Sequence, residues 1–303
     1  MKYYVYGFTD KGNFRNHNED AMLINHEVIR CGGAEAVISA PFLSAVCDGV
    51  GGEHKGEIAS KLCLQYLSLL NYNSSTDLSF ELMTIHNNIK KYGITHDDSV
   101  NMQTTLCCLA VDESGGAICV NVGDSRLYRY VKGKARQISS DQTYGKYLYE
   151  QGEINDLDEL DPQMRSAIIS SVGSVLQNPK IDLFPFVTTF GLEYDDTVFI
   201  FSDGVSDFIS TDEIEIAMSL ELPFKDKIEA LCELALKSGS TDNISVIGIK
   251  PFNSSEEYDN IIAPKIVRKE EFVPQVAIEE KDLADKSIAC LEKFINDLDN
   301  ADN

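Results

Sequence analysis

The chain has 303 residues, 43% of them hydrophobic, with 13 tyrosines, 14 phenylalanines and no tryptophan, which excludes a disordered or fibrous protein. Its formal net charge of -23 repels nucleic-acid phosphates and anionic membrane surfaces, so we expect neither as a partner. No stretch approaches the roughly 18 apolar residues of a membrane span, and the N-terminus lacks the apolar core of a signal peptide. The eight cysteines show neither CxxC nor Cys/His ligand spacing, so we expect reduced core residues and a cytoplasmic protein.

Short runs rich in β-branched and aromatic residues predict strands along much of the chain. Between the second and third runs, apolar residues recur at helical spacing over 58–70 and 78–92. Strands, then a helix pair, then more strands are typical of an α+β domain. The predicted strands are 3–9, 42–47, 104–111, 117–122, 126–131 and 197–201.

The stretch 104–131 contains two glycine-containing breaks, Ser114-Gly115-Gly116 and Gly123-Asp124-Ser125. They predict an antiparallel meander in which neighbouring strands pair directly. From 143 to 180 the pattern becomes polar and only partly helical, and we expect a surface excursion of the kind that often covers a site. The domain is completed by two predicted helices and a strand, 211–219, 224–237 and 244–249.

We place the end of the globular domain near Lys250, which divides the chain into a domain, 1–250, and an acidic tail, 251–303. The polar run 253–257 indicates a linker. Near the end, apolar residues recur at spacings of three and four, which predicts an amphipathic helix with an unknown partner. A partly disordered acidic tail is the alternative. The apolar positions are Ala284, Ile288, Leu291, Ile295 and Leu298.

Four short acidic segments far apart in the chain each place a carboxylate beside a turn or at a predicted strand end. Carboxylate oxygens, backbone carbonyls and water suit Mg²⁺ and Mn²⁺, and Mg²⁺ keeps most of its waters, so few ligands per segment suffice. The pattern therefore predicts one hard-metal site. Taken singly, each segment is more often a turn, a cap or a solvated loop. The segments are Asn18-Glu19-Asp20, Asp48-Gly49-Val50-Gly51-Gly52, Ser202-Asp203-Gly204 and Thr241-Asp242-Asn243.

With Arg15, Thr104-Thr105 and Gly123-Asp124-Ser125-Arg126 added, these motifs resemble, in order and approximate spacing, the metal-dependent PPM/PP2C family of protein serine/threonine phosphatases. The resemblance covers about 3–250 and is greatest for bacterial stand-alone members. It implies a β-sandwich of two mainly antiparallel sheets flanked by helices on both sides, a four-layer α/β/β/α arrangement. It also implies hydrolysis of phosphoserine and phosphothreonine by direct attack of a water or hydroxide that bridges two Mn²⁺ or Mg²⁺ ions.

The resemblance assigns a role to each acidic position. Asp48 would bridge the two metals, Glu19 would reach a metal through water, and Asn18 would orient its neighbours. Asp124 resembles the acid that helps to hold a third, weaker metal, but a hairpin turn explains that segment nearly as well. The implied direct metal ligands are Asp20, Asp48, Gly49, Asp203 and Asp242.

Arg15 resembles the family's phosphate clamp, a task suited to a guanidinium that can hold two phosphate oxygens, with a surface arginine as the alternative. Two positions depart from the family pattern. Val50 stands where animal members carry a histidine thought to protonate the leaving group, and His17, His54 or a metal-bound water are the alternatives for that role. Gln103 replaces the glycine of the family's Gly-Thr-Thr, which puts the local backbone geometry in question.

The partners that such a reaction implies are phosphorylated proteins, the substrates of a serine/threonine kinase, and the excursion 143–180 is the candidate for choosing among them. Two other classes of function stay open. A catalytically inactive family member would bind phosphoproteins or act as a scaffold, although every expected ligand position is filled. A generic acidic Ca²⁺-binding protein would show EF-hand spacing such as DxDxDG, which this sequence lacks.

Overall fold

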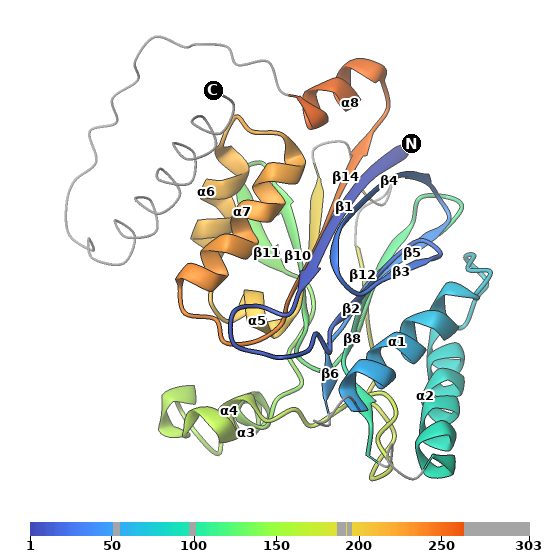
Figure 1. The fold of residues 1–303 in the computed structure, drawn as a ribbon, viewed down its shortest axis with the longest axis vertical. Helices are drawn as coiled ribbons and strands as arrows, with labels where there is room; N and C mark the ends of the chain where they lie inside the picture. The colour runs from blue at the N-terminus through green and yellow to red at the C-terminus, as the bar shows by residue number, and fades with distance from the viewer. Residues whose placement is uncertain (51–54, 97–100, 187–191, 193–195, 264–303) are drawn as a thin grey trace, which may run out of the picture.

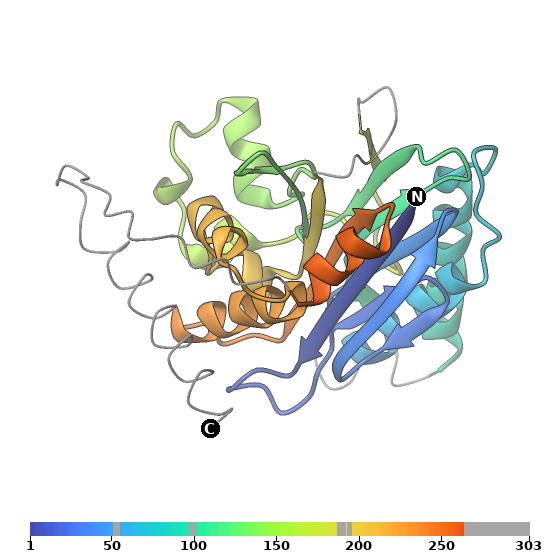
Figure 2. The same cartoon turned by 90° about the horizontal axis from the view of Figure 1, so that it is seen from above.

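Two antiparallel β-sheets pack face to face, and helices cover the outer face of each (Figures 1 and 2). The computed structural model describes residues 1–50, 55–96, 101–186, 192 and 196–263. The first sheet has the order β11 (Lys134–Gln137), β10 (Arg126–Val131), β13 (Thr197–Phe201), β14 (Ile244–Phe252), β1 (Lys2–Asp10), β4 (Gly32–Ser39). The second has the order β12 (Asp182–Pro185), β9 (Ala117–Val122), β8 (Leu106–Val111), β5 (Phe42–Cys47), β2 (Ala21–Ile24), β3 (Glu27–Ile29). The predicted four-layer α/β/β/α sandwich is confirmed.

Alternation along β1 shows how the sequence builds the layers. Tyr3 and Val5 point into the core between the two sheets, whereas Tyr4 and Tyr6 pack under the helices on the outer face. Because successive side chains of a strand point to opposite faces, a strand that is covered on both sides is apolar at almost every position. β5, β8 and β13 are buried along their whole length for this reason.

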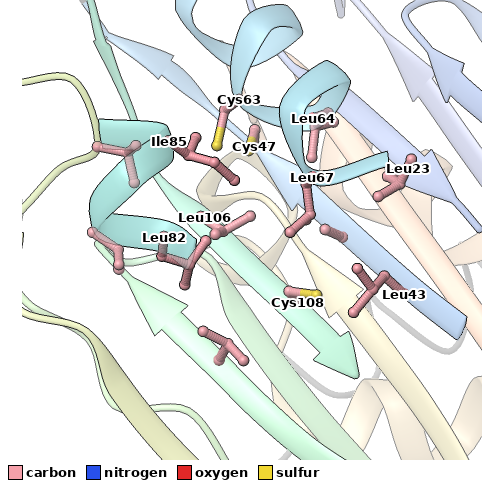
Figure 3. Close-up of a cluster of buried hydrophobic side chains, with 14 of the residues drawn as sticks. Leu23, Leu43, Cys47, Cys63, Leu64, Leu67, Leu82, Ile85, Leu106 and Cys108 are labelled. Atoms are coloured by element: carbon pink, nitrogen blue, oxygen red, sulfur yellow. The ribbon is translucent and has the colours of Figure 1, made fainter. Parts of the chain in front are cut away.

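One helical layer consists of α1 (Lys55–Ser68) and α2 (Leu78–Thr95), which cover the second sheet. Leucines from both helices meet sheet residues such as Leu23, Leu43 and Leu106 in a common core (Figure 3). The other layer covers the first sheet with α5 (Asp203–Ser206), α6 (Thr211–Ser219), α7 (Phe224–Lys237) and α8 (Ser255–Ile262). In the described part of the chain, no helix combines the length and apolarity needed to cross a bilayer.

The predicted meander is wrong at its second turn. β8 and β9 pair as expected, but β10 pairs with β11 and β13 in the other sheet. Gly123, with a φ of 99°, allows the chain to turn, but a turn signal does not say whether the next strand returns to the same sheet. The segment 123–125 therefore crosses between the sheets, which brings Asp124 to the end of the sandwich.

The predicted linker at 253–257 is also wrong. β14 continues to Phe252, and α8 begins at Ser255, where Ser254 and Glu257 form a reciprocal capping box. Such a box is a helix-start signal, which explains the polarity of this run. Tyr258 packs against Phe252, so the compact part of the chain extends beyond Lys250. The predicted amphipathic helix at 284–298 lies outside the described residues.

The excursion after β11 carries α3 (Tyr144–Gln151), the 3₁₀ turn η2 (Leu157–Glu159) and α4 (Pro162–Ser166), which lie at the lower edge of the sandwich in Figure 1. These elements are largely exposed, as expected for a surface excursion. The chain then returns through 169–174, which we call the return segment. Here the prediction differs from the structure, because Val172 is fully buried in the core beside α2.

Candidate active site

A cavity of about 380 Å³ opens at the end of the sandwich nearest the excursion. Each of the four predicted acidic segments contributes to its walls, although the segments lie far apart in the sequence. Asp20 is fully buried and interacts electrostatically with Asp203 and Asp242. The charged residues that line the cavity are Arg15, Glu19, Asp48, Asp124, Asp203 and Asp242.

Close contact between two glycine backbones shapes the turn after Asp48. A Cβ on Gly49 would lie 2.1 Å from the carbonyl oxygen of Gly56, and a Cβ on Gly56 would lie 2.4 Å from that of Gly49. Only glycine fits at both positions, so the start of α1 is held directly against the Asp48 turn. Gly56 is not among the predicted site residues, and its only signal in the sequence is a glycine just before the predicted helix at 58–70. Gly51 and Gly52 lie outside the described residues.

Two threonines hold the backbone of Asp48. Its carbonyl oxygen accepts hydrogen bonds from the Thr105 N–H and the Thr104 hydroxyl, both at 2.8 Å. Its own N–H donates to Thr105 Oγ1 at 2.9 Å. The short strand β7 (Gln103–Thr104) pairs with β6 (Gly49–Val50), and the Gln103 side chain accepts a hydrogen bond from Ser171. Gln103 in place of glycine is therefore compatible with a regular pairing at this point.

Asp203 and Asp242 are brought together by a second close backbone contact. Asp203 opens α5 directly after β13, and a Cβ on Gly204 would lie 2.0 Å from the carbonyl oxygen of Asn243. Ser202 and Ser245 also bond through their backbones at 3.0 Å. The strand ends of β13 and β14 are thus fixed side by side, which places both carboxylates on a rigid part of the sheet.

Asn243 connects this sheet end to the N-terminal acidic segment. Its Oδ1 accepts the Glu19 N–H at 2.8 Å, and its Nδ2 donates to the carbonyl oxygens of Lys11 and His17. Asn18 in turn accepts the Asp20 N–H and donates to Thr9, which supports its predicted role in orienting this segment. The predicted metal site included no role for Asn243, which the sequence marked only by its position after Asp242.

Arg15 reaches the cavity from the exposed N-terminal loop. Its Nη2 lies 2.7 Å from Asp242 Oδ2, and its side chain is 52% exposed. The remaining guanidinium N–H groups are therefore accessible to a bound anion. Val50 also lines the cavity, and no histidine is among the described lining residues. His17 is exposed, and His54 lies outside the described residues.

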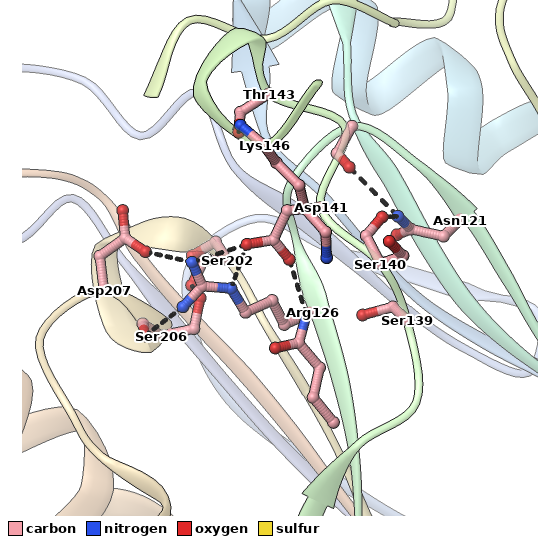
Figure 4. Close-up of polar contacts among 12 residues, drawn as sticks. Asn121, Arg126, Ser139, Ser140, Asp141, Thr143, Lys146, Ser202, Ser206 and Asp207 are labelled. Carbon is pink, nitrogen blue, oxygen red and sulfur yellow. Dashed lines mark hydrogen bonds and ion pairs between the residues drawn. The ribbon is translucent and has the colours of Figure 1, made fainter. Parts of the chain in front are cut away.

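Arg126, beside Asp124 in the Gly-Asp-Ser-Arg motif, serves a different cluster. Its guanidinium lies between Asp141 and Asp207, at 2.9 and 2.6 Å, and donates to the Ser206 carbonyl (Figure 4). Arg126 therefore pairs with acidic side chains outside the cavity lining. Asp124 itself is buried and has no ion pair in the described part of the chain.

Among the described residues that line the cavity, Arg15 is the only one with a positive charge, and it pairs with Asp242. Burial, followed by repulsion from neighbouring carboxylates, raises the pKa of Asp20 to about 7 and that of Asp203 to about 6. Burial and the charge of Asp203 also raise the pKa of both Asp48 and Asp124. Asp203 is thus the strongest neighbouring influence on Asp48, and the two carboxylates interact directly. Such a cluster is stable only when protons or cations offset the charge.

The donor set fits hard divalent cations. Asp20 Oδ1 and Asp203 Oδ1 are buried without a hydrogen-bond partner among the described residues, although buried carboxylate oxygens are normally paired. Carboxylates and the backbone of Gly49 are oxygen donors of the kind that Mg²⁺ and Mn²⁺ prefer. Across the described residues, no three Asp, Glu, His or Cys side chains are already arranged around one point, so binding would require these carboxylates to move closer together.

Known proteins resemble this chain in sequence and in fold. No family model matches the chain. Protein phosphatase PhpP of Streptococcus pneumoniae is 30% identical over 247 residues, which cover 78% of this chain and 93% of that protein. Serine/threonine phosphatase stp of Listeria welshimeri is 28% identical over 250 residues, covering 79% and 92%. The crystal structure of the Mycobacterium tuberculosis serine/threonine phosphatase PstP/Ppp is similar with a TM-score of 0.68 and 25% identity, over 84% of this chain and 100% of that one.

The chain belongs to the PPM/PP2C family of protein serine/threonine phosphatases. The family resemblance drawn from the motifs is therefore confirmed, and so is the phosphatase function that it implies. As a PPM/PP2C phosphatase, the protein acts on phosphorylated proteins. Nothing in the cavity or the relatives favours the inactive scaffold that the sequence left open.

Proposed function

We propose that this PPM/PP2C phosphatase depends on Mn²⁺ or Mg²⁺ held in the acidic cavity. The observation that carries the proposal is a group of carboxylates with raised pKa values around one cavity, two of which have a buried oxygen without a partner among the described residues. Asp48, Asp203 and Asp242, with the carbonyl of Gly49, would hold two ions, and Glu19 would contribute through water. Asp20 would be a further ligand, and Asp124 would support a third, weaker site.

Bound ions would offset the charge of the phosphate oxygens and lower the pKa of a water for direct attack on phosphorus. The protein's own groups supply orientation. Arg15, half exposed and anchored by Asp242, would bind two oxygens of the phosphate monoester, which positions the phosphorus over the carboxylates. Val50 leaves the cavity wall beside Asp48 apolar, so another group, such as a metal-bound water, would have to protonate the leaving group.

The substrates that we propose are phosphoserine and phosphothreonine proteins modified by a serine/threonine kinase. We also propose that the protein works in the cytoplasm. The described cysteines are all free thiols, six of them buried, which is typical of a reducing compartment.

The test is release of phosphate from p-nitrophenyl phosphate and from a phosphothreonine peptide with Mn²⁺, with Mg²⁺ and with EDTA. We expect turnover with either cation and none above background with EDTA. Equal rates in EDTA would contradict metal dependence. Tight binding of the phosphopeptide without phosphate release, at any metal concentration, would favour the inactive binding module.

A further inference from the structure

His86 is a polar residue in the apolar core that the proposed chemistry does not use. It lies on α2 and has no exposed surface. Its Nδ1 accepts a hydrogen bond from the Gly173 N–H at 3.0 Å, and its Nε2 has no partner among the described residues. Burying an imidazole with one unpaired nitrogen costs free energy. The presence of a histidine at this position therefore needs an explanation, and its bond to Gly173 is the candidate.

Gly173 allows the return segment to pack closely against α2. Its φ of 92° lies in the left-handed region, and a Cβ there would lie 2.6 Å from the Ile89 side chain and 3.0 Å from the Met102 carbonyl oxygen. A side chain at this position would push the return segment away from the helix. The His86 bond therefore acts at a point where the backbone has almost no freedom to shift.

From Gly173 a short series of hydrogen bonds leads to Asp48. Val172 and Thr104 exchange two backbone hydrogen bonds, at 2.8 and 3.0 Å, and Ser171 donates to the Gln103 side chain at 2.7 Å. Thr104 then donates its hydroxyl hydrogen to the Asp48 carbonyl oxygen. The return segment is thus hydrogen-bonded to β7, and β7 is hydrogen-bonded to the backbone of Asp48.

We infer that His86 is a positioning residue for the phosphatase reaction, which anchors the return segment so that β7 holds Asp48 in its working position. Since the excursion 143–168 continues directly into the return segment, the same bond fixes one end of the excursion to the core. His86 acts only through these neighbours and touches no substrate.

The neutral form of His86 suits this role. Burial, with a smaller contribution from Lys90, lowers the pKa of the imidazole, so Nδ1 remains an acceptor at neutral pH. The residues of the return segment and of 102–105 carry no ionisable side chain that could pair with it.

Three variants separate positioning from simple core packing. His86→Leu removes the acceptor and keeps an apolar side chain. His86→Asn keeps an acceptor oxygen at the place of Nδ1, whereas His86→Gln moves it to the place of Nε2. Leu78→Ala, in the same helix and core but about 12 Å from His86 along the axis, is the control for lost stability alone.

Backbone hydrogen exchange of the protein without added metal is the first readout, because it does not depend on metal binding. In His86→Leu we expect protection of the amides of 172–174 and 104–105 to fall about tenfold, and kcat with Mn²⁺ to fall about tenfold with KM little changed. His86→Asn should recover most of both losses, and His86→Gln should not.

The inference would be overturned if His86→Leu matched Leu78→Ala in kcat and in exchange at 104–105, which would make His86 a core residue only. It would also be overturned if His86→Gln equalled His86→Asn, a comparison that stands even if the leucine variant fails to fold. A wild type inactive with every cation would contradict the proposed metal dependence, while the exchange results would still decide the role of His86.

Discussion

Asp196 and Asp203 stand at the two ends of β13, and their surroundings differ in one respect. The Asp196 side chain, with no exposed surface, forms a two-point ion pair with Arg129 at 2.8 Å for both bonds. Asp203 faces Asp48 and Asp242 and has no cation in the described part of the chain. A structural carboxylate has its counter-charge built into the fold. We propose that Asp203, in the acidic cavity, receives its counter-charge from a bound cation.

The same contrast recurs within the Gly-Asp-Ser-Arg motif. Arg126 pairs with both Asp141 and Asp207 (Figure 4). Asp124, two residues earlier, lines the acidic cavity instead. Arg126 is thus close to Asp124 in the sequence but forms its ion pairs outside the cavity lining. Acidic side chains without an arginine or lysine partner, next to others that have one, are therefore the candidates for binding a cation.

Among the differences between Asp203 and Asp196, we expect the largest in the turnover of their variants. Asp203→Asn should lower kcat for a phosphothreonine peptide with Mn²⁺ by about 10³-fold or more, because an amide cannot replace a charged ligand of the proposed ions. Asp48→Asn should behave alike. Asp196→Asn is the matched control at the other end of β13, and it should keep kcat within a factor of about two in folded protein. Near-normal turnover in Asp203→Asn would contradict the interpretation that Asp203 is functional and Asp196 structural.

Stability should change in the opposite sense. Asp196→Asn removes the partner of Arg129, whose side chain is only 19% exposed, and should lower the free energy of unfolding by about 3 kcal/mol. Asp203→Asn relieves repulsion and should raise it by about 1–3 kcal/mol at neutral pH in EDTA. Urea unfolding with EDTA measures both. Destabilisation of the same size in both variants would contradict the comparison.

The pH dependence of stability follows from the raised pKa values. In EDTA, Asp20 and Asp203 hold protons in the folded state up to about pH 7 and about pH 6, whereas the unfolded chain releases them near 3.8. The folded state therefore binds more protons between these values, and the free energy of unfolding should fall as the pH rises from about 4 to about 7. Urea unfolding across this range should show a flatter slope in Asp203→Asn. An unchanged slope in that variant would mean that these carboxyls do not carry the effect.

The smallest of these effects is expected at Arg15, which is half exposed. Arg15→Ala should raise KM for a phosphopeptide about tenfold, and Arg15→Lys should recover only part of the loss, because an ammonium cannot hold two oxygens in one plane. Steady-state kinetics with saturating Mn²⁺ provide the comparison. Arg136→Ala, on β11 and outside the cavity lining, is the matched control. Equal KM values for Arg15→Ala and the control would contradict the role of Arg15 in binding phosphate and would make it an ordinary surface arginine.

Much of the fold could be predicted from local patterns. The helices at 211–219 and 224–237 and the strands at 117–122, 126–131 and 197–201 begin and end where predicted, because periodicity and turn residues act over a few positions. Strand pairing depends on the whole chain, so the crossing at Gly123 was read as a hairpin. The helix after β14 was read as a linker, because its polar capping residues outweighed its apolar ones.

The site divides in a similar way. Asp48, Asp203 and Asp242 could be named because an acid beside glycine or asparagine at a strand end leaves a pattern in the sequence. Asn243 and His86 act through contacts with residues far away in the chain, and nothing in their own neighbourhood points to those contacts. Gly56 contacts the nearby Gly49, but the sequence does not show that the two backbones touch.

The most direct test of the account is an anomalous difference map from a crystal of the protein grown with Mn²⁺. We predict manganese peaks in the acidic cavity, with the carboxylate of Asp48 and at least one of Asp203 and Asp242 within about 2.5 Å of an ion. Peaks confined to other acidic surfaces, with no ion close to Asp48, Asp203 or Asp242, would contradict it.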